Sequence, residues 1–249
     1  MSGVSTLHHH GSWLSRSIGR FAQEIIWRAG ALLYRRRFGL RVHGRDRLPR
    51  RGPYLLVSNH VSHLDGPAIL AARGAHYRRV FSLGARDYFF RGRLRSWLST
   101  YLLNMVPIDR SRPDFRAVER CRLIAAGRGV ILMFPEGTRS RTGELQPFRH
   151  GLGLIAERLG IPVVPVYVHG TFAALPKGSR FPRRRTVDVV FGDPIDVQPA
   201  RAAGRGRPTY RQTAAHVYRS VLELRAELRR SLRGARRDTE WTAPLSQSL

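Results

Sequence analysis

The chain has 249 residues, of which 44 are Lys or Arg and 17 are Asp or Glu, so its formal net charge at pH 7 is +27. Apolar residues make up 42% of the chain, which excludes a wholly disordered protein and is enough for one α/β domain with a buried core. The single cysteine, Cys121, excludes a disulfide scaffold and favours a reducing compartment.

The N-terminal part of the chain predicts an amphipathic helix. Residues 1–11 are expected to be flexible, and over residues 12–37 apolar side chains recur at spacings of three and four. Trp13 and Trp27 lie in this pattern, and the basic run Arg35 to Arg37 ends it. This combination is typical of a helix lying in an anionic membrane interface, so we expect a peripheral or monotopic anchor. The alternative is a helix that packs on its own domain.

The segment 38–197 alternates short β-rich runs with helical patterns. Strands are expected at 40–43, 54–58, 79–83, 105–108, 130–134, 163–169 and 186–191, and helices at 63–73, 94–102, 114–127 and 151–159. Two of the strands, VILMF and VVPVYV, are almost continuously apolar, which indicates burial on both faces. The sequence therefore predicts a single α/β domain with a mixed, largely parallel sheet covered by helices.

The remaining segment, residues 198–249, is expected to form a basic loop, a helix over 209–232 and a frayed tail from Gly234 onward. Within the domain, the strand at 163–169 contains Pro165 and follows Pro162. Proline is poorly tolerated in central strands, so this strand is predicted to be irregular or near a sheet edge, where it would line a pocket.

The first candidate site is NHVSHLD, directly after the strand at 54–58. His60 and Asp65 are five positions apart, which on a continuous helix is about 140° around the axis, so they can meet only if His60 lies in the turn before the helix. In that arrangement the carboxylate would hold one ring nitrogen and leave the other free as a general base. The alternative is a capping box, in which Ser62 and Asp65 cap the helix without any catalytic role.

Two further polar clusters follow strands. FPEGTRS brings Glu136, Gly137, Thr138 and Arg139 into one turn, a plausible anion site because glycine permits close backbone approach and arginine binds phosphate in a fork. VPIDR carries Asp109 and Arg110. Taken singly, the first cluster fits a solvated loop equally well, and the second fits a surface ion pair. Together they lie where open α/β sheets bind ligands, beyond the carboxyl ends of the strands.

The segments NHVSHLD, VPIDR, FPEGTRS and IPVVPV, in this order between residues 38 and 195, resemble the four motifs of the glycerolipid acyltransferase family. The resemblance implies that His60 is the general base, that Asp65 orients it, and that Ser62 is a cap and not a nucleophile. It also implies that Pro162 and Pro165 contact the donor or shape the pocket, and that the acceptor phosphate is bound by Arg86, Arg110, Glu136, Gly137, Thr138 and Arg139. The family often has a lysine where GARDYFF carries Arg86, and a glycine where the second motif carries Asn104.

The resemblance further implies an O-acyltransferase of phospholipid biosynthesis. It would move a fatty acyl chain from acyl-CoA or acyl carrier protein to the 2-hydroxyl of 1-acyl-sn-glycerol 3-phosphate, giving phosphatidic acid. Glycerol 3-phosphate, another lysophospholipid or a lyso-aminolipid remain as alternative acceptors. We expect no cofactor and no metal, and we expect the enzyme to work on an anionic membrane surface at the cytoplasmic face.

The basic charge also admits a different class of function. An arginine-rich chain with a net charge of +27 could bind nucleic acid through phosphate contacts. However, aromatic and basic residues are not interleaved on one segment as a single-strand platform requires. Nucleic-acid binding therefore stays a remote alternative, and no nucleic-acid partner is expected.

Overall fold

The computed structural model of the chain describes residues 13–74, 77–109, 114–197 and 210–241. Its centre is a seven-stranded sheet with the strand order β1-β7-β6-β2-β5-β3-β4. The strands are β1 (Arg41–His43), β2 (Tyr54–Ser58), β3 (Val80–Ala85), β4 (Met105–Ile108), β5 (Val130–Met133), β6 (Val163–His169) and β7 (Asp188–Phe191). Neighbouring strands are parallel except β6 and β7, which are antiparallel. The prediction of a mixed, largely parallel sheet is confirmed.

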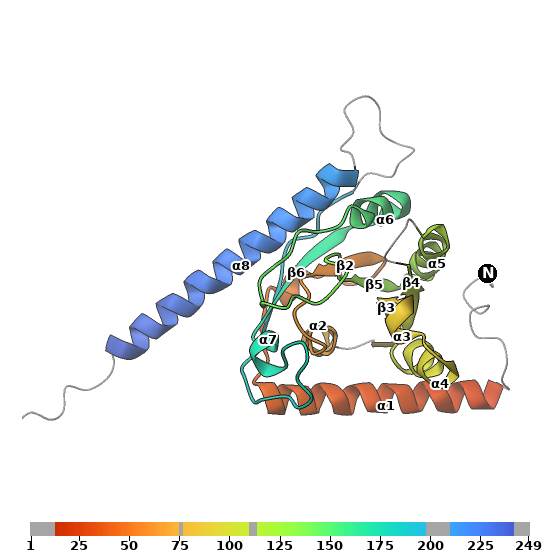
Figure 1. Cartoon of the computed structure of the whole chain (residues 1–249), viewed down its shortest axis with the longest axis horizontal. Helices are drawn as coiled ribbons and strands as arrows, with labels where there is room; N and C mark the ends of the chain where they lie inside the picture. Colours follow the sequence, from red (N-terminus) through yellow and green to blue (C-terminus); the bar gives the residue numbers. More distant parts are fainter. Residues whose placement is uncertain (1–12, 75–76, 110–113, 198–209, 242–249) are drawn as a thin grey trace, which may run out of the picture.

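Helices cover both faces of this sheet (Figure 1). They are α1 (Trp13–Phe38), α2 (Asp65–Arg73), α3 (Arg86–Phe89), α4 (Arg93–Trp97), α5 (Phe115–Ala126), α6 (Gly151–Leu159), α7 (Thr171–Ala174) and α8 (Tyr210–Trp241), with short helices of other types at η2 (Arg45–Arg47), η3 (Tyr77–Arg79) and η4 (Leu98–Leu102). The helices α5, α6 and α8 pack on one face, and α1 and α2 pack on the other.

Strand β2 shows why the central strands are continuous apolar runs. Leu55 and Val57 belong to the core shared with α5, α6 and α8, whereas Tyr54 and Leu56 belong to the core shared with α1 and α2. Successive side chains of a strand point to opposite faces, and here both faces are covered. Each residue of β2 is therefore buried.

Several helix boundaries differ from the sequence prediction. The helix expected at 63–73 begins at Asp65, and the one expected at 94–102 is α4 followed by η4, a π-helical turn. The four-residue helices α3 and α7 have no counterpart in the prediction, because one turn is too short to show a helical period. α8 continues through Gly234 to Trp241, since a glycine inside a helix costs only about 1 kcal/mol. The prediction of a frayed tail from Gly234 is therefore wrong over 234–241, and the rest of that tail lies outside the described residues, as do the predicted flexible start over 1–11 and the predicted basic loop.

Strand β6 lies between β2 and β7, so the prediction of an irregular strand near an edge is wrong. The carbonyl of Pro165 accepts a hydrogen bond from the backbone N–H of Gly192, 2.9 Å away and one residue beyond the end of β7. Both backbone polar groups of a strand residue face the same neighbour. The N–H that proline lacks is therefore absent only at the end of the β6–β7 ladder, where the loss disturbs the sheet least.

Helix α1 has two apolar faces. On the inner face, Tyr34 and Phe38 are buried in the core shared with α2, and Trp27 stacks on Tyr77 with ring centroids 6.0 Å apart. The outer face leaves large apolar side chains between 51% and 68% exposed: Ile25, Ile26, Leu32 and Leu33. In the part of the chain that the structure describes, none of the helices combines the length and the apolar composition needed to cross a bilayer.

Candidate active site

Polar side chains gather at the carboxyl edge of the sheet. The turn after β2 carries His60 and Asp65, the turn after β5 carries Glu136 and Arg139, and α3, directly after β3, begins with Arg86. β5 lies between β2 and β3 and runs parallel to both. Turns that are far apart in the sequence therefore meet at one edge, as expected for a ligand site in an open sheet.

His60 and Asp65 are in contact, with Nδ1 of His60 2.9 Å from Oδ2 of Asp65. The chain becomes helical only at Asp65, so His60 stands in the turn and the carboxylate points back to it. Asp65 is fully buried, whereas the side chain of His60 is 20% exposed. An imidazole whose Nδ1–H donates to a carboxylate keeps an unprotonated Nε2 that can accept a proton.

The carboxylate of Asp65 receives three further hydrogen bonds. Its Oδ2 accepts from the backbone N–H groups of Val61, at 2.7 Å, and Ser62, at 2.8 Å. Its Oδ1 accepts from the hydroxyl of Thr171 at 2.6 Å. A buried carboxylate needs such partners to offset the hydration it has lost, and they also fix its position against the imidazole.

The capping-box alternative is realised in part. Asp65 caps the backbone N–H of Ser62, as that alternative requires, but with the same oxygen that contacts His60. The hydroxyl of Ser62 accepts from the N–H of Leu64 at 3.2 Å and donates to the carbonyl of Leu175 at 2.7 Å. Ser62 therefore stabilises the turn before α2, and its hydroxyl is engaged on both sides.

Glu136 contacts the same histidine from the turn after β5. Its Oε1 accepts from the backbone N–H of His60 at 3.0 Å, and the residue is only 3% exposed. The N–H of Ser140 donates to the carbonyl of His60 at 2.8 Å, and the ring of Phe134 stacks on the imidazole with centroids 4.2 Å apart. Burial raises the pKa of Glu136 to about 8, although hydrogen bonds from the backbone of His60 and Gln146 oppose this shift.

The shape of the β5 turn depends on Gly137. Its φ of +75° lies in the left-handed region, and a Cβ there would lie 2.6 Å from Nε of Arg149. The backbone N–H of Arg149 is itself bonded to the carbonyl of Pro135 at 2.9 Å. A side chain at position 137 would therefore strain the turn and displace a guanidinium. The next residue, Thr138, is exposed.

His63, Tyr88 and Arg139 lie together on three different elements. Nε2 of His63 is 3.1 Å from the hydroxyl of Tyr88, and their rings stack with centroids 5.8 Å apart. Partial burial, together with the nearby charge of Arg139 and the proximity of His60, lowers the pKa of His63 to about 4. His63 is therefore neutral at physiological pH, and the guanidinium of Arg139 lies close enough to His63 to act on its pKa.

Arg86 lies further along the same edge. Its Nη2 is 3.9 Å from Oδ2 of Asp114, and half of its side chain is exposed. Asp114 caps α5 by accepting from the N–H of Ala117 at 3.0 Å, and it also accepts from the N–H of Asp109 at 2.9 Å. Arg110, another candidate ligand of the acceptor phosphate, falls outside the described residues.

The two prolines are not brought to His60. Pro162 precedes β6 at the amino edge of the sheet, opposite the edge that carries His60, and Pro165 is buried inside the strand. In the described part of the chain, no three His, Cys, Asp or Glu side chains converge as ligands for a metal ion.

Sequence reasoning missed residues that support the site from a distance. Asn59 donates to the carbonyl of Val168 at 3.0 Å and accepts from its N–H at 2.8 Å, which extends the pairing of β2 with β6 past the end of β2. Thr171 reaches Asp65 from 106 positions away. Asn59 lies inside the first motif, so its type and place were a usable signal. Thr171 had none, because only the sheet topology places it beside β2.

Known proteins resemble this chain over the segment that carries the site. A chloroplastic 1-acyl-sn-glycerol-3-phosphate acyltransferase of Brassica napus is 33% identical over 141 residues, which are 55% of this chain and 39% of that protein. The human 1-acyl-sn-glycerol-3-phosphate acyltransferase alpha is 31% identical over 134 residues, which are 52% of this chain and 46% of that protein. The chain thus spans less than half the length of these relatives.

A solved structure has the same fold. It is the crystal structure of the 1-acyl-sn-glycerophosphate (LPA) acyltransferase of Thermotoga maritima, with a TM-score of 0.64, 24% identity, and coverage of 89% of this chain and 86% of that one. The family model described as Acyltransferase matches residues 39–169, more than half of the chain, and this stretch runs from β1 to the end of β6 with both turns that contact His60. The chain therefore belongs to the acyltransferase family.

Proposed function

We propose that this protein is an O-acyltransferase that moves a fatty acyl chain from a thioester, acyl-CoA or acyl carrier protein, to the 2-hydroxyl of 1-acyl-sn-glycerol 3-phosphate. The hydroxyl oxygen attacks the thioester carbonyl, an ester bond forms and the carbon–sulfur bond breaks. The hydroxyl proton passes to the base and from there to the leaving thiolate. The products are phosphatidic acid and a free thiol.

The observation that carries this proposal is the contact of His60 Nδ1 with the fully buried Asp65 at 2.9 Å. The carboxylate fixes the tautomer in which Nε2 is the free base, and it stabilises the imidazolium formed when the proton arrives. The hydroxyl of Ser62 is engaged at Leu64 and Leu175, which supports direct transfer to the acceptor in place of an acyl-serine intermediate.

Arginines at the same edge provide the acceptor site in this proposal. Arg139 is close enough to His63 to act on its pKa, and it leads the phosphate contacts, with Arg86 and Arg110 as further candidates. In the same turn, the backbone at Gly137 and Thr138 would lie close to the phosphate. Glu136 takes a positioning role, because its buried carboxyl group bonds to the backbone of His60. Pro162 and Pro165 shape the strand and have no donor contact in this proposal.

The outer face of α1 is proposed as a membrane-docking surface at the cytoplasmic face. It combines exposed Leu32 and Leu33 with the basic run that ends the helix. Because Tyr34 and Phe38 are buried in the core, deletion of α1 would also damage the domain, and a point change is the better test. Leu33→Asp is expected to abolish flotation with anionic vesicles. Phe115→Asp is the matched control, since Phe115 on α5 is 66% exposed against 68% for Leu33; equal flotation of both variants would refute the docking surface.

The activity is tested by thiol release from a long-chain acyl-CoA in detergent, with and without lysophosphatidic acid. Release that depends on the acceptor is expected, and His60→Ala should lower it by about 10³-fold or more, as loss of a catalytic base does. The control is His63→Ala, which removes the neighbouring imidazole and is expected to cost less than about 10-fold. A folded His60→Ala protein with full activity would contradict the mechanism. Thiol release that does not depend on the acceptor would contradict the proposal of acyl transfer.

A further inference from the structure

A basic hollow lies at the same edge of the sheet as the candidate active site. A hollow of about 370 Å³ is lined by Arg36, Phe38 and Gly39 at the end of α1, and by Arg184, Arg185 and Thr186 before β7. Three of these six residues are arginines and none is acidic. A hollow lined by three arginines and a threonine has the types of donor that bind a phosphate group.

The two walls of the hollow are held together by the backbone. The N–H of Val187 donates to the carbonyl of Phe38 at 3.0 Å, and the N–H of Arg41 donates to the carbonyl of Val187 at 2.9 Å. Gly170 packs so closely on the carbonyl of Thr186 that a Cβ would lie 2.1 Å from it. The hollow is therefore formed before any ligand arrives, which lowers the cost of binding.

The hollow opens at the same edge of the sheet as His60. β7 is antiparallel to β6, so the residues before β7 lie at the carboxyl end of β6. Gly170, which packs on Thr186, directly precedes the Thr171 that bonds to Asp65. A ligand bound in this hollow would consequently fix the position of the sheet edge that carries His60 relative to the molecule or surface to which the ligand belongs.

Exposed apolar side chains flank both walls. Leu32 and Leu33 precede Arg36 by four and three positions on α1, so the three share one side of the helix, and the two leucines are 52% and 68% exposed. Phe181, three residues before Arg184, is 82% exposed. If these side chains enter the apolar layer of a bilayer, the arginines come to the depth of the lipid phosphates.

We infer that this hollow binds the headgroup phosphate of an anionic membrane lipid that is not itself a reactant. Bidentate contacts from Arg184 and Arg185 on one wall and from Arg36 on the other would hold the phosphate. The bound headgroup would set the rotation of α1 on the bilayer and turn the edge with His60 toward the membrane surface. This inference adds a lipid site to the proposed function and does not depend on which acceptor reacts.

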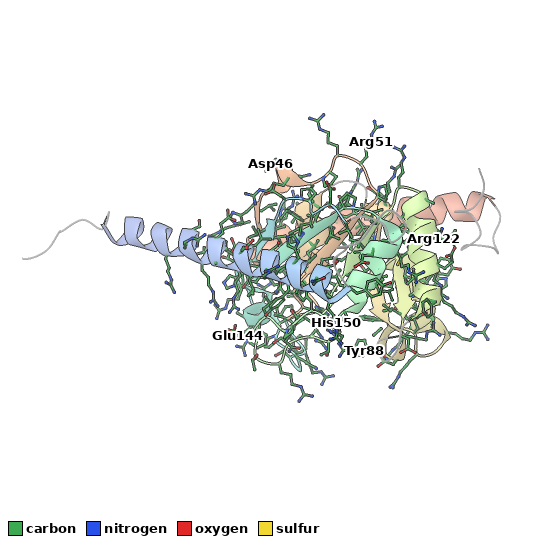
Figure 2. The ribbon with its side chains drawn as sticks, turned by 90° about the horizontal axis from the view of Figure 1, so that it is seen from above. Asp46, Arg51, Tyr88, Arg122, Glu144 and His150 are labelled. Atoms are coloured by element: carbon green, nitrogen blue, oxygen red, sulfur yellow. The ribbon has the colours of Figure 1, made fainter. Side chains whose placement is uncertain are left out.

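The test uses the full chain with the double variant R184Q/R185Q. The matched control is R50Q/R51Q, which removes the same charge from two exposed arginines before β2; Arg51 lies on the opposite side of the molecule from Tyr88 (Figure 2). Sedimentation with phosphatidylcholine vesicles that contain a minor fraction of phosphatidylglycerol measures binding. R184Q/R185Q should bind about 10-fold more weakly or worse, and R50Q/R51Q less than about 3-fold more weakly. Thermal melts should show both variants folded, because all four side chains are exposed.

Three results would overturn the inference. Equal losses in the two double variants would show that binding follows net charge and needs no site. Unchanged vesicle binding with a raised KM for acyl-CoA would assign the hollow to a donor phosphate, and unchanged binding with a raised KM for lysophosphatidic acid would assign it to the acceptor. Because vesicle binding is measured without turnover, failure of this inference is distinguishable from failure of the proposed activity.

Discussion

Two turns at the carboxyl edge of the sheet each present a buried carboxyl group to His60. The two carboxyl groups differ in how many hydrogen bonds they accept. In the turn after β2, Asp65 accepts from His60, Val61, Ser62 and Thr171. In the turn after β5, Glu136 accepts at Oε1, but its buried Oε2 has no hydrogen-bond partner among the described residues. Burial raises the pKa of Glu136 to about 8, so this group is mostly protonated at neutral pH.

The difference assigns separate tasks to the two groups. The Asp65 carboxylate accepts from four donors and can stabilise an imidazolium at His60. A neutral carboxyl group bonded to the backbone of His60 holds the base in place without adding a second negative charge. A second negative charge would favour the protonated imidazole, which cannot act as a base. In the proposed mechanism, the turn after β2 therefore controls the chemistry of His60, and the turn after β5 controls its position.

The largest expected effect comes from Asp65→Asn. The amide keeps the shape of the side chain but removes the charge and favours the wrong tautomer of His60, so kcat for thiol release should fall by about 10³- to 10⁴-fold. The matched change in the other turn is Glu136→Gln, which should cost less than about 10-fold at neutral pH. Equal losses in the two amide variants would break the comparison, because both carboxyl groups would then act through their charge.

The spacing of the residues left the task of Asp65 undecided before the family resemblance was considered, and the structure explains why. The capping box and the catalytic pair use the same oxygen of Asp65, because Oδ2 accepts from both Ser62 and His60. No spacing rule separates two arrangements that coexist. The task of Glu136 was hidden for another reason: it lies 76 positions from His60, and the backbone contact between them requires β2 and β5 to be neighbours.

The fold was more accessible than the site. The continuous apolar runs of β5 and β6 predicted their own burial, because a strand covered on both faces leaves little room for polar side chains. A different argument failed at β6, where Pro165 suggested a strand near the edge. The loss of a backbone N–H weakens the sheet only where the neighbouring strand offers a carbonyl to it. The position at which β7 ends decides this, and the sequence of β6 contains no information about where β7 ends.

An intermediate effect is expected from Arg139→Ala, which tests whether the β5 turn also binds substrate. Loss of a charge-assisted contact to phosphate costs about 1.5–3 kcal/mol, so the KM for lysophosphatidic acid should rise by about 10- to 100-fold while the KM for acyl-CoA changes less than about 3-fold. Arg141→Ala is the control, since Arg141 is an exposed arginine two residues further on. Equal changes in both KM values, or an equal effect of Arg141→Ala, would contradict the acceptor assignment.

A separate effect on stability sharpens the comparison through pH. The pKa of Glu136 is raised from 4.5 to about 8 in the folded protein, so the folded state binds one more proton than the unfolded state between these values. Its contribution to stability is complete below pH 4.5 and is lost as pH rises through about 8, with a slope of at most about 1.4 kcal/mol per pH unit.

Glu136→Gln cannot lose this proton, so the difference in unfolding free energy should shift in favour of the glutamine variant as pH rises across that window. Urea unfolding of both proteins on either side of the window measures the shift. A difference that does not change with pH would mean that Glu136 is ionised throughout, and the two turns would then present two negative charges to His60.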